Sequence, residues 1–173
     1  GFFFEPCLAA QEADQAHPSF QNVTMDAELL RGTPDLLLFL KRPRPGESER
    51  CLYAFLEGAS GRYAADRLIA QGRGRTLAEA MKQPFSGQTD LHNPIEPLGA
   101  VRAAITVPAG GSAKLAFVLG YASGRQKAAM DAQEMREELA SCLDLAFAQA
   151  RSALQLRGIE GGKAALFERI GAR

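Results

Sequence analysis

Two stretches in which apolar residues alternate with other residues constrain this fold more than any other feature of the sequence. Apolar side chains occupy every second position of 101–107, and again every second position of 115–121. Period-two alternation is typical of β-strands with one buried face. The segment 108–112, Pro-Ala-Gly-Gly-Ser, supplies turn residues between the two runs. The pattern therefore predicts an antiparallel β-hairpin over 101–121.

Further strands are predicted in the first third of the chain, from apolar runs bounded by turn residues. Gly and Pro in 31–35 predict a turn, and the proline-rich polar segment 41–47 predicts a loop. At 76–82 we expect a short helical segment instead. Residues 1–122 are therefore expected to be mainly β. The predicted strands are 20–25, 36–40 and 51–56.

The pattern changes at residue 123, after which apolar residues recur at intervals of three and four, as on one face of a helix. Arg157 and Gly158 match a common helix end, a cation in the last turn followed by glycine. A further helix is expected over 163–170. We expect the apolar face of 138–157 to pack on the β region. That face consists of Leu139, Leu143, Phe147, Ala150 and Leu154.

Charge and cysteine content exclude several classes of protein. Twenty basic and twenty acidic residues cancel, so there is no electrostatic basis for binding nucleic acid or anionic membrane. No apolar run approaches the ~18 residues of a membrane span. Three cysteines far apart in sequence argue against a disulfide framework and for a reducing, cytoplasmic compartment. We expect Cys7, Cys51 and Cys142 to be buried. With two histidines and no CxxC pair, no structural metal is expected.

The segment 72–75, Gly-Arg-Gly-Arg, is the first candidate for a functional loop. It lacks the third glycine of the dinucleotide fingerprint and the Gly-Lys-Ser/Thr of a P-loop, so we expect no nucleotide cofactor. Glycine on each side of Arg73 indicates a sharp turn, because glycine enters positive φ freely. Such a turn would present Arg73 and Arg75, whose guanidinium forks suit anions and planar interfaces. The alternative is a solvated loop.

Asp90, His92 and Asn93 form the second candidate, because polar groups so close together would suit a hydroxylated ligand. The alternative is a turn held by Asx hydrogen bonds. Asp66 and Glu57 are a conceivable carboxylate pair for glycoside chemistry. Acidic residues at strand ends are common, however, and we assign no catalytic residue.

Short motifs in a particular order along nearly the whole chain resemble one known family. They are Glu-Pro-Cys-Leu-Ala (5–9), Ala-Asp-Gln-Ala-His-Pro-Ser-Phe (13–20), Ala-Asp-Arg-Leu-Ile (65–69), Gly-Arg-Gly-Arg-Thr (72–76), Ser-Gly-Gln-Thr (86–89), Asn-Pro-Ile (93–95), Pro-Ala-Gly-Gly (108–111), Ala-Phe-Val-Leu-Gly (116–120), Leu-Gln-Leu-Arg-Gly-Ile (154–159) and Ala-Leu-Phe-Glu-Arg (165–169). Their order and spacing resemble glycoside hydrolase family 94, formerly glycosyltransferase family 36. That family contains the cellobiose and chitobiose phosphorylases and the cyclic β-1,2-glucan synthases.

The resemblance implies a galactose-mutarotase-like antiparallel β-sandwich, a helical linker, and an α/α barrel that carries the catalytic aspartate. Residues 1–122 would be the later strands of the sandwich. Residues 123–173 would be the linker to a barrel that lies outside this chain, as would the first strands of the sandwich. The implied role is a non-catalytic, carbohydrate-associated module of a glucan-active phosphorylase or synthase, with no cofactor or metal of its own.

The partners that the resemblance implies are the catalytic barrel, a glucan ligand and a second copy of the chain. Arg73 and Arg75 would face the barrel or a second subunit. The parent enzyme would process β-glucosidic bonds with inorganic phosphate as co-substrate, in the cytoplasm, with association with the inner membrane left open. From the residues alone, two alternatives remain: a free-standing carbohydrate-binding module, and an interaction module that binds no sugar.

Overall fold

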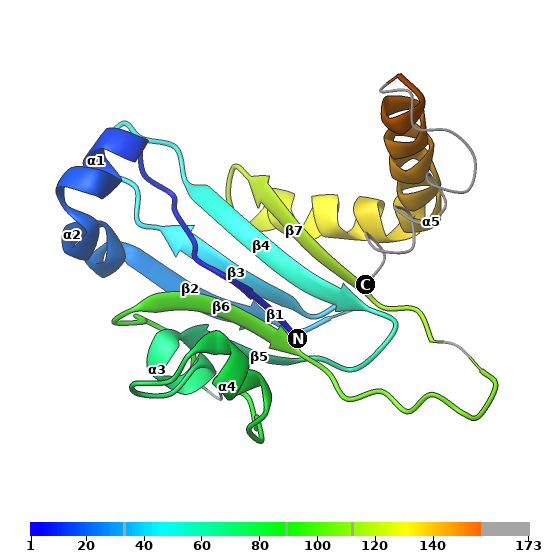
Figure 1. Cartoon of the computed structure of the whole chain (residues 1–173). Coiled ribbons are helices and arrows are strands. Elements are labelled where there is room, and N and C mark those ends of the chain that lie inside the picture. Colours follow the sequence, from blue (N-terminus) through cyan, green and yellow to red (C-terminus); the bar gives the residue numbers. More distant parts are fainter. Residues whose placement is uncertain (33, 89, 112, 157–173) are drawn as a thin grey trace. The chain divides into compact units, whose positions relative to one another are not determined.

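The computed structural model contains two antiparallel β-sheets that face each other (Figure 1). Sheet A has three strands in the order β1-β6-β5, and sheet B has four in the order β2-β3-β4-β7. The predicted fold class, an antiparallel β-sandwich followed by helix, is confirmed. The strands are β1 (Phe2–Phe4), β2 (Met25–Leu30), β3 (Leu36–Lys41), β4 (Arg50–Glu57), β5 (Arg62–Asp66), β6 (Pro97–Arg102) and β7 (Ala116–Ala122).

The chain divides into two units, Gly1–Gln133 and Glu134–Arg173. The first unit holds both sheets, and the last helix begins in it and continues into the second unit. No helix in the described part of the chain is both long and apolar enough to cross a membrane. The helices are α1 (Gln11–Ala16), α2 (Pro18–Val23), α3 (Arg67–Ala70), α4 (Leu77–Met81) and α5 (Arg125–Leu156). The structure describes residues 1–32, 34–88, 90–111 and 113–156.

The main core lies between the two sheets, where side chains from alternate positions of facing strands meet. Leu37 and Phe39 of β3 and Val101 of β6 are fully buried there. Each such side chain stabilises the fold by roughly 1.5–3 kcal/mol. Phe4 of β1 packs edge-on against Phe39, with ring centroids 5.7 Å apart. A Cβ at Gly99 would come within 2.2 Å of the Phe4 ring, so glycine at that position of β6 allows the ring to lie in the core.

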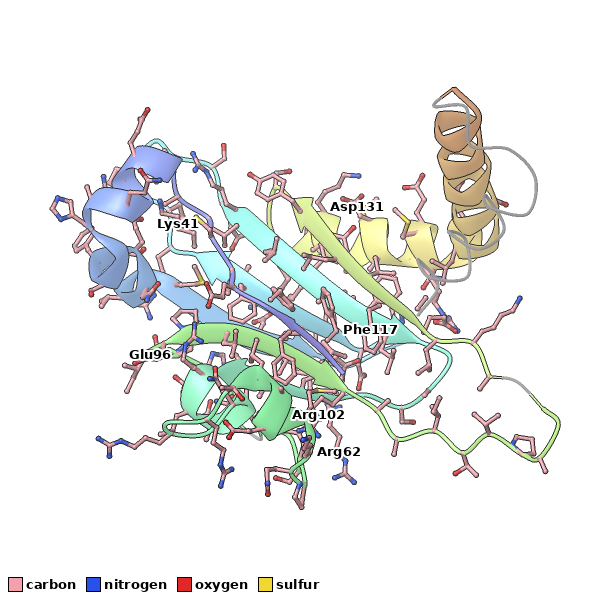
Figure 2. All side chains as sticks on the ribbon, viewed as in Figure 1. Lys41, Arg62, Glu96, Arg102, Phe117 and Asp131 are labelled. Atoms are coloured by element: carbon pink, nitrogen blue, oxygen red, sulfur yellow. The ribbon has the colours of Figure 1, made fainter. Side chains whose placement is uncertain are left out.

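A second, smaller core lies on the outer face of sheet A, beneath α3. Its buried residues are mostly small, including Ala64 and Ala100 of the sheet and Ala70 of α3. Small side chains let the helix approach the sheet closely. Arg102, which Figure 2 labels at the end of β6, extends this layer. Its guanidinium lies 4.9 Å from the ring centroid of Phe85. The same guanidinium donates to the carbonyl oxygens of Ala80, Met81 and Gln83.

The outer face of sheet B carries the first turns of α5. Arg125 forms an ion pair with Glu28 of β2, and its backbone N–H donates to Glu49 at 3.3 Å. Two alanines one turn apart, Ala128 and Ala132, are fully buried. These contacts fix where α5 begins, and they agree with the prediction that helix replaces strand after residue 123.

Several predicted elements are confirmed. Strands β3 and β4 contain the predicted runs 36–40 and 51–56. The turn at 31–35 closes the β2–β3 hairpin, where Asp35 accepts hydrogen bonds from Arg31 and from the N–H of Gly32. Helix α4 lies within the predicted segment 76–82. Strands β1, β2 and β5 and helices α1 and α3 were not predicted.

The predicted hairpin over 101–121 is wrong. Strand β6 lies in sheet A between β1 and β5, whereas β7 lies in sheet B against β4. In the connection 103–115, Ile105 and Val107 are exposed, and its described residues contain no strand. The physical reason is that period-two alternation indicates which face of a strand is buried and does not specify the partner strand.

The strand predicted over 20–25 is also wrong, because residues 20–23 belong to α2 and only Met25 lies in a strand. Pro18 occupies the first turn of the helix, where its fixed φ is favourable. At the other end, the Thr24 hydroxyl donates to the carbonyl oxygen of Gln21 at 2.8 Å. These local signals outweigh the β propensity of Phe20 and Val23. Strand β2 starts immediately afterwards, at Met25.

The predictions for the C-terminal region are tested only in part. A continuous helix runs to Leu156, as α5. The side chains of Leu143, Phe147 and Leu154, the expected helix end at Gly158 and the expected helix 163–170 lie outside the described residues. The packing of that apolar face therefore stays a prediction.

Two of the three cysteines can be compared with the prediction of burial. Cys51 on β4 is fully buried, and this burial raises the pKa of its thiol to about 12. Cys7 is exposed, so the prediction is wrong there: it lies in the loop after β1, with its thiol against the carbonyl oxygen of Ala9. The side chain of Cys142 lies outside the described residues.

Candidate functional site

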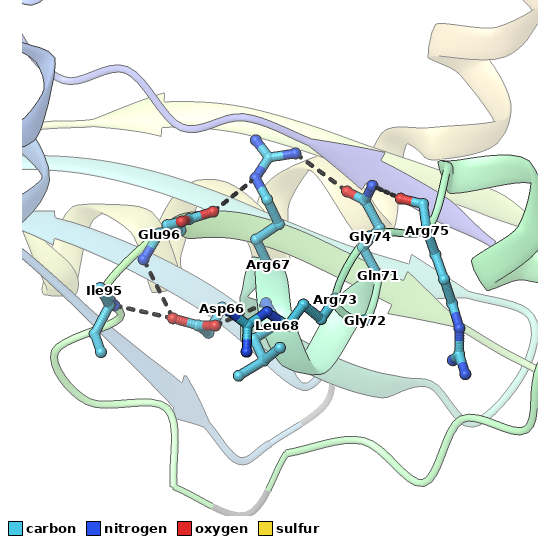
Figure 3. Close-up of a pocket in the computed structure, with 10 residues that line it drawn as sticks. All are labelled: Asp66, Arg67, Leu68, Gln71, Gly72, Arg73, Gly74, Arg75, Ile95 and Glu96. Atoms are coloured by element: carbon cyan, nitrogen blue, oxygen red, sulfur yellow. Dashed lines mark hydrogen bonds and ion pairs between the residues drawn. The ribbon is translucent and has the colours of Figure 1, made fainter.

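Asp66 organises the surface that contains the first candidate loop (Figure 3). It ends β5 and caps α3, accepting a hydrogen bond from the N–H of Leu68 at 2.8 Å. Its other oxygen accepts from the N–H groups of Ile95 and Glu96, at 2.9 and 3.3 Å. One carboxylate thus joins a strand, a helix and a distant loop. The carboxylate pair considered for Asp66 and Glu57 has no support, because the two residues end strands of different sheets and Asp66 is engaged with backbone groups.

Arg67, the first residue of α3, bridges two acidic groups of this surface. Its guanidinium pairs with Glu5 at 2.5 Å and with Glu96 at 3.4 Å, and it donates to the Gln71 side chain at 3.1 Å. Glu5 and Glu96 therefore share a single positive charge, that of Arg67. The remaining positive charges of the surface belong to Arg73 and Arg75.

The Gly72–Arg75 segment forms the sharp turn predicted from its glycines. Gly72 and Gly74 have φ of 85° and 68°, in the left-handed region that favours glycine. The N–H of Gly72 closes α3 by donating to Leu68 at 3.0 Å, and the Gln71 side chain donates to the Arg75 carbonyl oxygen. The backbone of this loop is consequently held at both ends. Within the part of the chain that the structure describes, neither Arg73 nor Arg75 uses its exposed guanidinium in a hydrogen bond or an ion pair.

An open pocket of about 450 Å³ lies along this loop. Its walls include two aliphatic side chains that point to solvent, Leu68 at 60 % exposure and Ile95 at 86 %. Arg73 and Arg75 complete the lining on the loop side, as Figure 3 shows. Aliphatic groups beside unpaired guanidiniums suit a partner surface that offers both carboxylates and apolar contacts.

The second candidate, Asp90 with His92 and Asn93, forms a turn held largely by internal bonds. The Asp90 carboxylate accepts from the N–H of His92 at 3.1 Å, which is the Asx hydrogen bond considered above. Asn93 has φ of 51°, and its side-chain oxygen accepts from Arg42. Leu91 lies in the main core beneath the turn. The turn is therefore anchored rather than open, while the His92 ring stays largely exposed.

Asp26 of β2 is a member of this second cluster that the sequence did not indicate. One of its oxygens accepts from the N–H of Asn93 at 2.9 Å and lies 3.3 Å from Nδ1 of His92. Burial by itself raises the pKa of Asp26, but hydrogen bonds from the N–H groups of Asn93 and Ala27 and from the His92 ring outweigh it and hold the pKa below its ordinary value. The carboxylate thereby stays ionised and fixes the turn to sheet B.

The two candidate groups do not share one pocket. Arg73 and Arg75 line the pocket beside α3, and Asp90, His92 and Asn93 are absent from its lining. They are connected through 94–96, since Ile95 and Glu96 bind Asp66 on one side while Asn93 binds Asp26 on the other. No group of three or more metal-ligating side chains occurs among the residues that the structure describes.

Comparison with known proteins identifies the family of this chain. The family model described as glycosyl hydrolase 94, supersandwich domain, matches residues 2–138. A curated relative is the cyclic beta-(1,2)-glucan synthase NdvB of Rhizobium meliloti (strain 1021), 28 % identical over 180 residues. That alignment covers 98 % of this chain and 6 % of NdvB, so the chain spans only a small part of the relative's length. Since the family match includes both sheets and the start of α5, the chain belongs to the glycosyl hydrolase 94 supersandwich-domain family.

Proposed function

We propose that this chain is a non-catalytic, carbohydrate-associated module of a glucan-active enzyme, and that it supports a catalytic α/α barrel. The family match and the name of the NdvB relative support this role. The parent enzyme would synthesise or phosphorolyse β-linked glucans, with inorganic phosphate as co-substrate in the second case. In this proposal, the module contributes a surface rather than reacting groups.

The observation that carries the proposal is the pair of guanidiniums at Arg73 and Arg75. Their backbone is fixed by two glycines and by Gln71, yet among the described residues neither guanidinium forms a hydrogen bond or an ion pair. Exposed charges of this kind add little to the stability of their own unit. Presented beside Leu68 and Ile95, they suit carboxylates on a second surface. We assign that surface to the catalytic barrel.

The test uses the full-length parent enzyme with Arg73→Ala and Arg75→Ala combined. Lys114→Ala is the control, because Lys114 is an exposed cation in the β6–β7 connection. The double variant should lower glucan product formation at least severalfold and separate the thermal unfolding of module and barrel, while the control should do neither. Equal activity and joint unfolding of all three proteins would contradict the proposal.

A direct glucan contact by Asp90, His92 and Asn93 takes second place, because Asp90 and Asn93 already use side-chain oxygens internally. Calorimetric titration of the isolated chain with linear and cyclic β-glucans tests it. Binding that is lost in His92→Ala, together with normal activity of the arginine variant, would favour a free-standing carbohydrate-binding module instead.

A further inference from the structure

Two arginines lie side by side on the outer face of sheet A, at the end of the sheet where β5 begins and β6 ends (Figure 2). Arg62 of β5 pairs directly with Arg102 of β6, two positions along from the pair Ala64–Ala100. Residues two apart on a strand share a face, and Ala64 and Ala100 belong to the small core beneath α3. Both arginine side chains therefore leave the sheet on the side that carries α3.

This pair brings two positive charges together without an acidic partner. In the part of the chain that the structure describes, neither guanidinium forms an ion pair with a carboxylate. Like charges directly opposite each other in an antiparallel ladder are destabilising. An anion between Arg62 and Arg102 would remove that cost.

Backbone carbonyl oxygens hold both guanidiniums beside one phenylalanine. Arg62 donates to the carbonyl oxygen of Phe85 at 2.9 Å, and the Arg102 guanidinium lies over the Phe85 ring. Arg102 also donates to three carbonyl oxygens of 80–83, at 2.9–3.3 Å. Carbonyl oxygens carry no net charge, so these bonds fix the side chains without balancing them. A guanidinium has five N–H groups, so each arginine keeps N–H groups that no described residue accepts.

An open pocket of about 530 Å³ lies against the pair, in the size range of small-molecule sites. Its lining includes a hydroxyl residue, Ser60, and an amide residue, Gln83, both exposed and both able to donate further hydrogen bonds. Small residues, among them Gly61 and Ala103, form other parts of the wall and leave the space open. None of the residues that line this pocket lines the one beside α3.

We propose that this pocket binds a phosphate group, either as inorganic phosphate or on a small organic ester, with Arg62 and Arg102 as its cationic contacts. A phosphate group carries roughly −1.5 to −2 charges at pH 7, which matches two guanidiniums, whereas a carboxylate carries one. Planar guanidinium forks bind phosphate oxygens in pairs through charge-assisted hydrogen bonds. The inference does not rest on the proposed function, because the pocket is complete within this chain.

The two arginines contribute differently to the site. Arg102 is half-buried and held by three carbonyl oxygens, so it supplies a charge at a fixed position. Arg62 is exposed and has a single hydrogen bond to the chain, so its fork can adjust to the ligand. Substitution of Arg62 is therefore the test that disturbs the fold least.

Calorimetric titration of the chain with inorganic phosphate at constant ionic strength tests the site. We expect saturable binding of one phosphate, weakened at least tenfold in Arg62→Gln. Arg62→Lys keeps the charge without the fork and should weaken binding less. Arg44→Gln removes an exposed guanidinium from the β3–β4 loop, outside the lining of the pocket, and is the matched control. It should bind phosphate as the wild type does.

Thermal unfolding of each variant without phosphate checks that the chain is folded. Absence of saturable phosphate binding to the wild type would overturn the proposal. Equal affinity of the folded Arg62→Gln variant and the wild type would overturn it too, because binding would then not involve the arginine pair.

Titration with glucose 1-phosphate and with glucose distinguishes the sources of the phosphate group. Tighter binding of glucose 1-phosphate than of inorganic phosphate assigns the pocket to an ester, and weaker or equal binding assigns it to the free anion. Glucose alone should not displace phosphate, and displacement would overturn the proposal, since the pocket would then recognise sugar hydroxyls. An unchanged activity of the Arg73 and Arg75 variant, with these results intact, would contradict only the proposed function.

Discussion

At the scale of single residues, two carboxylates hold the candidate surfaces in place. Asp66 accepts three backbone hydrogen bonds from two segments, and Asp26 accepts from a loop far away in sequence. Both oxygens of Asp66 accept hydrogen bonds from backbone N–H groups, and one oxygen of Asp26 accepts from the N–H groups of Ala27 and Asn93. Their contribution is to position other residues.

The first prediction concerns Asp66. Replacing it by Ala removes the cap of α3 and leaves the N–H groups of Ile95 and Glu96 without an acceptor, so the free energy of unfolding should fall by about 1–3 kcal/mol. Asp66→Asn keeps one acceptor oxygen, so its free energy of unfolding should fall by less. Urea unfolding measures both variants. An Ala variant as stable as the wild type would show that the three bonds contribute nothing net.

The second prediction concerns the acid side of the stability profile. The pKa of Asp26 is lowered in the folded chain from its ordinary 3.8. Its contribution to stability is thus fully present above pH 3.8 and is lost as the pH falls through the folded pKa. Asp26→Asn should therefore be less stable than wild type at pH 7, with a gap that narrows below pH 3.8. Unfolding curves from pH 7 to pH 2 measure this, and a constant gap would contradict it.

At the scale of elements, a glycine in β7 makes room for an aromatic ring of β4. Gly120 lies opposite Tyr53, and a Cβ at Gly120 would come within 2.2 Å of the Tyr53 ring. The buried ring thus occupies the space that a side chain of β7 would otherwise fill. Tyr53 lies on the outer face of sheet B, near Lys127 and Asp131 in the first turns of α5.

The third prediction tests that fit. Gly120→Ala should destabilise the chain by about 1–3 kcal/mol, because an extra methyl forces the Tyr53 ring from its place. In the Tyr53→Val background the same change should cost much less, since the ring is gone. A double-mutant cycle of unfolding free energies measures the coupling. Additive effects would show that the ring moves aside freely.

The elements that were predicted correctly have strong local signals. The apolar run of β3 and the glycine-flanked Arg73 turn each carry their cause within a few residues. The hairpin over 101–121 was wrong because strand partners are chosen by burial of whole faces. The role of Asp26 was not predictable for a related reason: its partners, His92 and Asn93, are brought to it only by the packing of the two sheets.

At the scale of the whole described sandwich, burial differs along the inner face of sheet B. Leu37 of β3 is fully buried, whereas Leu119 of β7, on the same face, is 46 % exposed. The first lies under sheet A and the second beyond its edge. Although they share one face of one sheet, Leu37 and Leu119 should therefore contribute unequally to the free energy of unfolding of the isolated chain.

The fourth prediction uses this contrast. Leu37→Ala should lower the free energy of unfolding by about 2–5 kcal/mol, as for a fully buried leucine. Leu119→Ala should lower it by less than about 1 kcal/mol, because much of the side chain remains in water. Guanidinium unfolding of the isolated chain measures both. Equal losses would mean that Leu119 is covered even without additional polypeptide.

The connection 103–115 has a consequence for engineering. It leaves one sheet and enters the other, and most of it is exposed without strand structure in its described part. Each doubling of a flexible loop costs only about 0.6 kcal/mol. The fifth prediction is that ten Gly/Ser residues inserted after Gly110 lower stability by about 1 kcal/mol or less in urea unfolding, and a larger loss would show that the path itself is needed. The connection 103–115 should therefore accept an inserted reporter or affinity tag while both sheets keep their strand pairing.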